Sequence, residues 1–166
     1  MANDESYRYA SMTNGDNEIE VMISSALDNL DLIQTLSDCV TAFMKFDENS
    51  AHWIGMSIRE AVTNAIQHGN KLDLGKKVEV CYKMTEESLT VSVRDQGCGF
   101  KSNEIPNPLE GDNLLKPSGR GIFYMRSFMD EVEFRPLATG GTEVYMVKKL
   151  KTTDFNEENG EGNGNC

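Results

Sequence analysis

Apolar residues recur at three- and four-residue spacing in two segments of the chain, which is the spacing of an amphipathic helix. The first segment runs from about residue 28 to 45, and its apolar positions are Leu30, Ile33, Leu36, Val40 and Phe43. The second spans about residues 50 to 69, and its apolar positions are Ile54, Ile58, Val62 and Ala65. Ser50 is a suitable N-cap for this second helix, and Gly69 is a suitable stop. The pattern predicts two long helices, each with one buried side.

Alternation of apolar and polar residues indicates the strands. It covers residues 76–84 and 88–95, which are joined by Thr-Glu-Glu, and it is typical of an antiparallel hairpin with one buried face. A short β-branched run at 19–23 and the segments 131–136 and 141–150 also fit strands. Residues 119–131 predict a third helix, whose apolar side carries Ile122, Phe123, Met125 and Met129.

The predicted elements follow the order β-α-α-β-β-loop-α-β-β, with no internal repeat. Hairpin strands and helices with single apolar stripes favour an α+β fold: a two-layer α/β sandwich whose mostly antiparallel sheet carries its helices on one face. Residues 18–150 are expected to form this domain, whereas residues 1–17 and the acidic segment 151–166 are expected to be disordered. Residues 101–117, interrupted by three prolines, predict a long loop of the kind that often forms a lid.

The composition of the chain disfavours some classes of binding partner, nucleic acid first among them. The net charge of -11 at pH 7 opposes association with a nucleic-acid backbone. The sequence has neither a signal-peptide pattern nor an apolar run of membrane-spanning length, so we expect a cytoplasmic protein with no membrane partner. Its four cysteines form no C-x-x-C pair and indicate neither a zinc site nor a disulfide framework. A small anionic ligand is compatible with these features if backbone N–H groups, a helix N-terminus or a metal ion supply positive potential.

Glu60 and Asn64 lie four residues apart in the second predicted helix, which places their side chains on one face, one turn apart. An Asn carbonyl oxygen is a suitable ligand for Mg²⁺, and a nearby carboxylate can order the waters of the metal or accept a proton. For such a pair alone, a solvated polar face is the more common explanation. His68, one further turn along, is interpreted as structural.

Two segments contain closely spaced glycines. Asp95 ends the second strand of the hairpin, and Gly97 and Gly99 then let the backbone turn sharply or approach a ligand. Gly119 and Gly121 stand at the entrance to the third helix, where unpaired N–H groups and the helix dipole favour an anion. This second segment is neither a Walker A loop nor a dinucleotide fingerprint. Taken singly, an ordinary turn and a flexible lead-in also explain them.

Taken together and in this order, the segments resemble the four motifs of the Bergerat-type ATPases, which include histidine kinases, gyrase and the mismatch-repair ATPases. The motifs are an Asn-bearing helix, a strand ending in Asp-x-Gly-x-Gly, a loop leading into Gly-x-Gly, and a final strand entered through Gly-Gly-Thr. The chain is similar in particular to the bacterial anti-sigma-factor serine/threonine kinases, through EAVTNAIQHGN, VRDQGCGF, SGRGIFYMRSFMDEVEF and GGTEVYMVK. The resemblance covers about residues 19–150 and implies the Bergerat ATP-binding fold.

The resemblance implies that ATP and Mg²⁺ are the cofactors. Asn64 would ligate the Mg²⁺ that bridges the ATP phosphates, and Glu60 would be the catalytic base that activates a substrate hydroxyl. Backbone N–H groups of Gly119, Arg120 and Gly121 would contact the phosphates, with residues 101–117 as the lid. The Arg120 guanidinium also suits bidentate contacts with phosphate oxygens.

For the adenine end, the resemblance implies that Asp95 accepts a hydrogen bond from the amino group of the base. Gly97 and Gly99 would let the base lie against the chain, and Thr142 would assist there directly or through water. No covalent nucleophile is required, because phosphoryl transfer depends mainly on positioning and electrostatic stabilisation.

The implied activity is that of an ATP-dependent serine/threonine kinase that is also an anti-sigma factor. It would sequester a sigma factor and phosphorylate an anti-anti-sigma factor, and related kinases commonly form homodimers. The region from Ile19 to Phe43 is the candidate dimer face, although a core stripe explains its apolar residues equally well.

The alternative from another class is a nucleotide-gated switch that holds a partner without chemistry. The ATPase half of a histidine kinase is a weaker hypothesis, because the only histidines, His52 and His68, lie in one helical segment. A gyrase-like or mismatch-repair role is weaker still, because we expect no room for the additional domain of those machines.

Overall fold

A computed structural model describes residues 17–99 and 117–151, with the backbone alone for residues 117–120. The predicted lid, apart from Pro117, lies outside the described residues, as do nearly all residues of the two segments that are predicted to be disordered. These three expectations therefore stay predictions.

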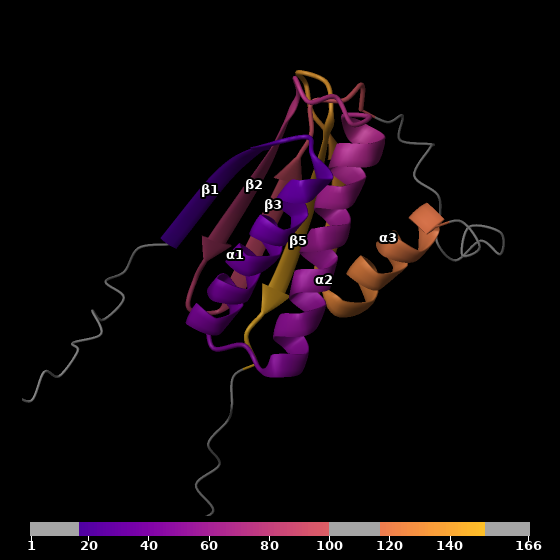
Figure 1. Ribbon diagram of the computed structural model, residues 1–166. Helices are drawn as coiled ribbons and strands as arrows, with labels where there is room; N and C mark the ends of the chain where they lie inside the picture. The colour runs from indigo at the N-terminus through magenta and orange to yellow at the C-terminus, as the bar shows by residue number, and fades with distance from the viewer. Residues whose placement is uncertain (1–16, 100–116, 152–166) are drawn as a thin grey trace, which may run out of the picture.

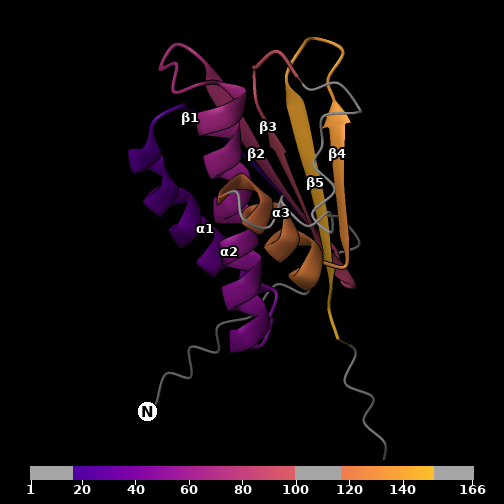
Figure 2. The same cartoon turned by 90° about the vertical axis from the view of Figure 1, so that its right-hand side faces the viewer.

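The described strands form one five-stranded sheet with the order β1-β2-β3-β5-β4 (Figure 1 and Figure 2). The strands are β1 (Asn17–Ser24), β2 (Lys77–Met84), β3 (Ser88–Arg94), β4 (Glu131–Pro136) and β5 (Thr142–Lys149). Each pair of neighbours is antiparallel, which confirms the predicted sheet. Strand β5 lies between β3 and β4, so the strand ends that carry Asp95 and Thr142 are adjacent.

The helices cover one face of this sheet, as Figure 2 shows, and the predicted two-layer α+β fold is confirmed. They are α1 (Leu30–Phe43), α2 (Glu48–Asn64) and α3 (Pro117–Phe128), with a short 3-10 turn (Leu27–Asn29) before α1. Alternate residues of β2 and β3 face the helices and are buried: Val78, Val80, Tyr82, Met84, Leu89, Val91 and Val93. Ile33, Ile54 and Ile58 from the helices are fully buried in the same core. Period-two burial on the strands and helical spacing on α1 and α2 thus meet in one apolar layer.

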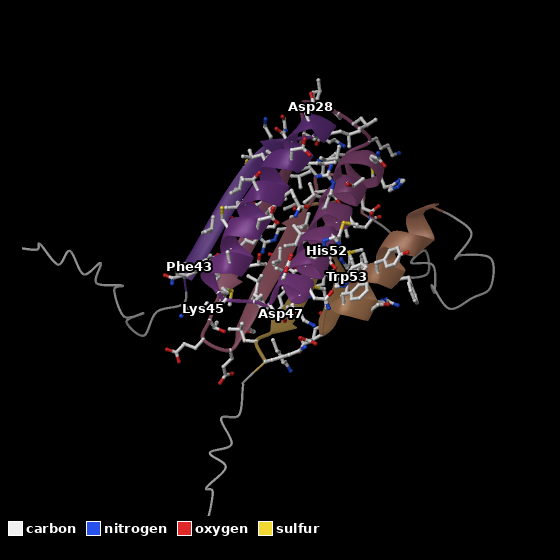
Figure 3. All side chains as sticks on the ribbon, turned by 60° about the horizontal axis from the view of Figure 1, so that its bottom comes forward. Asp28, Phe43, Lys45, Asp47, His52 and Trp53 are labelled. Carbon is white, nitrogen blue, oxygen red and sulfur yellow. The ribbon has the colours of Figure 1, made fainter. Side chains whose placement is uncertain are left out.

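The N-cap of the second helix lies three residues before the predicted cap. Asp47, labelled in Figure 3 at the start of α2, is the N-cap. Its Oδ1 accepts a hydrogen bond from the Ser50 backbone N–H at 3.0 Å, and its Oδ2 accepts one from the Ser50 hydroxyl at 2.6 Å. The assignment of Ser50 as the cap is therefore wrong, because Ser50 lies inside the first turn and donates to the cap.

At its other end, α2 widens into a π-helical turn, Ala65–Gly69, in which the Asn70 N–H donates to the Ala65 carbonyl at 2.8 Å. The predicted stop at Gly69 agrees with the end of this turn. His68 is exposed, and the structure gives it no hydrogen bond within the described residues. The π turn is important for the site because it carries Gly69 and Asn70 toward the end of β3.

Helix α3 is held by methionines and by one aromatic stack. Met125 and Met129 are buried as predicted, but Phe123 is 40% exposed, so its assignment to the apolar side is wrong. The ring of Phe128 stacks instead on Trp53 of α2, with centroids 3.6 Å apart. Figure 3 shows Trp53 beside α3.

The face of the sheet away from the helices carries a charged network near the strand ends. Arg94 pairs with Glu79 and with Glu143, the latter at 2.8 Å, and Arg135 pairs with Glu143 at 3.3 Å. The network connects β2, β3, β5 and β4 next to Asp95 and Thr142. No helix within the described residues is long and apolar enough to cross a membrane.

Candidate functional site

Asp95 is fixed at the point where the chain leaves β3. It is 7% exposed, and its Oδ1 accepts hydrogen bonds from the N–H groups of Gly97 at 2.8 Å and Thr142 at 3.3 Å. Its own N–H donates to the Thr142 carbonyl at 3.0 Å. The second oxygen, Oδ2, has no hydrogen-bond partner within residues 17–99 and 117–151. One oxygen thus orients the carboxyl group, and the other can accept a hydrogen bond from a ligand.

Burial raises the pKa of Asp95 above its ordinary value, because a buried carboxylate loses hydration. The N–H groups of Gly97 and Thr142 oppose this rise, and the charge of Lys76 opposes it further. A ligand that donates a hydrogen bond would stabilise the ionised form in the same way. The environment of Asp95 therefore favours a donor such as an amino group.

Three glycines enclose Asp95 from different segments. A Cβ added at Gly69 or Gly97 would lie less than 3.0 Å from an Asp95 side-chain oxygen, and one at Gly141 less than 3.0 Å from the Asp95 backbone oxygen. Real Cβ atoms do not approach so closely, so these positions require glycine for packing reasons. Gly99 has φ of +71° and would bring a Cβ 3.0 Å from the Gly141 carbonyl oxygen. The predicted Asp-x-Gly-x-Gly segment is therefore a packed site rather than a loose turn.

Glu60 and Asn64 point to each other from successive turns of α2. The Asn64 Nδ2 donates a hydrogen bond to Glu60 Oε1 at 3.3 Å, and both side chains are half-buried. The same bond turns the Asn64 carbonyl oxygen away from the carboxylate, which leaves it available to a cation. The predicted pairing on one helical face agrees with this geometry.

Helix α3 meets the pair at Gly121. A Cβ there would lie less than 3.0 Å from the Glu60 carboxylate, so the helix backbone is directly against this side chain. The helix begins at Pro117, so Gly119, Arg120 and Gly121 lie in its first turns and not in a loop that leads into it. Proline is favoured at such a first position because its missing N–H has no helical partner there. Of the side chain of Arg120 the structure says nothing.

Magnesium is compatible with the residues present. No group of three or more His, Cys, Asp or Glu side chains that could hold a metal exists within the described parts of the chain. Mg²⁺ commonly takes one or two protein oxygens and completes its shell with waters and substrate phosphates. The carbonyl oxygen of Asn64 suits that role, with the Glu60 carboxylate beside it.

The structure thus brings the predicted residues into two groups. Asp95, Gly97, Gly99 and Thr142 meet at the ends of β3 and β5, whereas Glu60, Asn64 and Gly121 meet between α2 and α3. The π turn after α2 connects the groups, because Asn64 precedes it and Gly69 ends it against Asp95.

Sequence reasoning assigned no site role to Gly69, Asn70 or Gly141. Gly69 was interpreted only as a helix stop, and Gly141 only as part of a strand entry. The one available signal was their position inside the segments EAVTNAIQHGN and GGTEVYMVK.

The fold and this arrangement define a nucleotide-binding domain of the histidine-kinase type. Residues 23–148 match the family described as histidine kinase-like ATPase domain, and the chain belongs to this family. Several curated relatives to which it is similar are named anti-sigma F factor. One from Clostridium perfringens (strain SM101 / Type A) is 31% identical over 154 residues, which cover 90% of this chain and 99% of the relative.

A second relative of the same name, from Oceanobacillus iheyensis, is 29% identical over 153 residues, covering 90% of this chain and 94% of the relative. A third, from Clostridium acetobutylicum, is 37% identical over 99 residues, covering 58% and 68% of the two chains. The predicted resemblance to the Bergerat-type superfamily and to its anti-sigma branch is confirmed.

Proposed function

We propose that this protein is an ATP-dependent serine/threonine protein kinase that acts as a cytoplasmic anti-sigma factor. The observation that carries the proposal is the position of Glu60: one carboxylate lies where a candidate metal ligand, Asn64, meets the first turns of α3 at Gly121. Membership in the ATPase family supports ATP as the ligand of this site.

The adenine end of the nucleotide is placed at Asp95. Oδ2 of Asp95 would accept a hydrogen bond from the amino group of adenine, while Oδ1 is held by the backbone. Gly97 and Gly141 support this role by packing, because a Cβ at either position would collide with Gly69 or Asp95 and displace the carboxyl group that receives the base. Thr142 would contribute at the same place, directly or through water.

The phosphates are placed between α2 and α3. The N–H groups of Gly119, Arg120 and Gly121 would contact the phosphates at the positive end of the helix dipole. Gly119 is the third residue of α3, so its N–H has no helical acceptor, whereas the N–H groups of Arg120 and Gly121 would have to leave the helical pattern to reach a phosphate. Asn64 would hold Mg²⁺ through its carbonyl oxygen, and the metal would offset phosphate charge.

The reaction needs one proton acceptor. A serine or threonine hydroxyl of the substrate would attack the γ-phosphorus of ATP, the bond from this phosphorus to the β-γ bridging oxygen would break, and ADP would leave. Glu60 would take the proton of the hydroxyl, while Asn64 orients its carboxylate through the 3.3 Å hydrogen bond.

The names of the relatives support a sigma factor as the partner that this protein sequesters. An anti-anti-sigma factor would be the phosphorylation substrate and would compete for the same protein.

We further propose a homodimer through the β1–α1 side. Strand β1 is at the edge of the sheet, and a groove of about 450 Å³ beside it is lined by apolar residues that include Ile19, Leu36 and Phe43. Phe43 is 53% exposed, as expected of a residue that a second copy would cover.

Phosphotransfer from γ-labelled Mg-ATP to small proteins of the source organism tests the kinase proposal. Wild type is compared with Glu60→Gln, which keeps the shape of the side chain, and with Glu48→Gln, an exposed position on the same helix. We expect label on a small protein with wild type and Glu48→Gln and a loss of 100-fold or more with Glu60→Gln, roughly the contribution of general base catalysis.

Equal transfer by wild type and Glu60→Gln would show that the assigned base is wrong. Bound ATP with no transfer by wild type would favour the nucleotide-gated switch, in which regulation of the sigma factor survives the loss of Glu60 but not of Asp95.

A further inference from the structure

Asn70 is completely buried, although asparagine is a polar residue that is usually exposed. Each polar atom of its side chain is hydrogen-bonded. Oδ1 accepts from the Gln96 N–H at 2.8 Å, and Nδ2 donates to the Ser25 hydroxyl at 2.7 Å and to the Lys77 carbonyl at 2.8 Å. A buried amide with these partners is costly to remove, because the Gln96 N–H would lose its acceptor and the Lys77 carbonyl would lose the amide donor.

These bonds belong to a network that we name the Asn70 network. Asn70, Lys77 and Gln96 form a closed ring, and Ser25 is bonded to Asn70 outside this ring. The Lys77 N–H donates back to Gln96 Oε1 at 2.8 Å, so Gln96 is held through both its backbone and its side chain. The whole network connects the end of β1, the start of β2 and the turn after β3.

The position of Gln96 explains what the ring does. Gln96 follows Asp95 and lies beyond the last residue pair of β2 and β3, Glu79 with Arg94, so the sheet does not fix its N–H. Asn70 takes the place of a strand neighbour for this N–H. The turn 95–97 is then held on one side by Asn70 and on the other by the bonds of Asp95 Oδ1 to Gly97 and Thr142.

We infer that Asn70 is a positioning residue for recognition of the adenine amino group: it holds the turn 95–97 so that the free oxygen of Asp95 faces the base. Asn70 itself touches no ligand in this role. The inference rests on the proposed function, because it needs adenine at Asp95.

The test measures the preference for ATP over purine riboside 5′-triphosphate, which lacks only the 6-amino group. Dissociation constants are measured for wild type, Asp95→Asn, Asn70→Ala and Ser25→Ala. We expect wild type to prefer ATP by about tenfold or more, the contribution of one hydrogen bond to a charged group. Asn70→Ala should reduce this preference to about twofold or less, and binding of the analogue should change much less.

Ser25→Ala is the matched control, because it removes a buried partner of the same amide but leaves the bond to Gln96. It is expected to lower thermal stability while the preference for ATP stays. A merely structural role of Asn70 would weaken both nucleotides equally, and this result would overturn the inference.

If Asn70→Ala does not fold, Asn70→Asp replaces it, since the carboxylate keeps an oxygen for the Gln96 N–H. The preference should then persist, and its loss would contradict the role assigned to that bond. A wild type without preference, or an Asp95→Asn variant that keeps it, would refute adenine binding at Asp95. If wild type prefers ATP, Asp95→Asn loses this preference and Asn70→Ala keeps it in full, the role of Asn70 is refuted while adenine binding at Asp95 stands.

Discussion

The β4–β5 turn contains two adjacent glycines with nearly the same backbone conformation, and of the two only Gly141 packs against Asp95. Alanine at Gly141 therefore tests this packing, with alanine at Gly140 as the control. Gly140 and Gly141 have φ of +87° and +91°, so alanine is strained at both by about 1–2 kcal/mol. They differ in what the new Cβ would meet. At Gly140 it would lie 3.3 Å from the Gly97 carbonyl oxygen, whereas at Gly141 it would lie less than 3.0 Å from both the carbonyl carbon and the oxygen of Asp95.

Backbone atoms at the end of a sheet strand cannot rotate away as a side chain can. Gly141→Ala should therefore cost about 1–3 kcal/mol more than Gly140→Ala, the usual range for overpacking. At about 4 °C per kcal/mol for a domain of this size, the Tm of Gly141→Ala should be about 4–12 °C lower. Because Asp95 must move, affinity for ATP should fall by about tenfold or more in Gly141→Ala only.

Thermal unfolding by circular dichroism and titration with ATP at a temperature where both variants are folded measure these two effects. Equal Tm values for the two variants would show that the contact of the new Cβ with Asp95 does not lower the stability. A Gly141→Ala protein that is less stable but binds ATP like wild type would separate the packing from the site and refute the assignment of Asp95.

The remaining predictions concern charge and helix contacts. Because burial raises the pKa of Asp95, the stability that this carboxyl contributes is complete below its unfolded pKa and is lost as the pH rises through its folded pKa. In thermal unfolding without nucleotide, the stability of Asp95→Asn relative to wild type should thus be higher at pH 7 than at pH 4. This pH dependence is not expected of the exposed control Asp38→Asn. Gly121→Ala should push α3 away from α2, which destabilises the protein by about 1–3 kcal/mol and shifts the fluorescence of the sole tryptophan, Trp53. Deletion of the exposed Gln67 should convert the π turn to an α turn and lower ATP affinity by at least tenfold in a binding titration.

Each of these predictions has a result that would contradict it. A stability difference between wild type and Asp95→Asn that does not depend on pH would mean that burial of this carboxyl carries no cost. Unchanged fluorescence in a destabilised Gly121→Ala protein would place the strain away from α3. Normal ATP affinity after deletion of Gln67 would show that the π turn does not position the end of the site.

Much of the fold could be predicted because its signals are local. Alternation over β2 and β3 defines both the hairpin and its buried face, and the structure buries the expected residues. The predicted N-cap of α2 was wrong because Asp47 and Ser50 are both good capping residues and lie only three positions apart. Only the geometry decides which side chain accepts a hydrogen bond from the first turn. Phe123 was misplaced because α3 packs through Phe128 and Trp53, a contact between segments far apart in the sequence.

The candidate site also has one part that local sequence signals predict and another that depends on contacts between distant residues. The Glu60–Asn64 pair could be predicted because four residues on a helix place two side chains together. Asn70 and Gly141 could not, because their partners lie 26 and 46 positions away, at Gln96 and Asp95. Nothing near Asn70 in the sequence distinguishes a buried amide from an ordinary residue after a helix.

The π turn at the end of α2 gives these distant contacts a common cause. An α-helical continuation would direct the Asn70 N–H to Ile66, but the bond goes to Ala65, one residue earlier, so the turn holds an additional residue. This wider turn brings Gly69 against Asp95 and Asn70 against Gln96. The residues proposed for the metal and for adenine are thus joined by one short stretch of backbone, and a change in the winding of α2 after Asn64 would be felt at Asp95. We therefore expect this turn, rather than the sheet, to set the distance between the two ends of the nucleotide site.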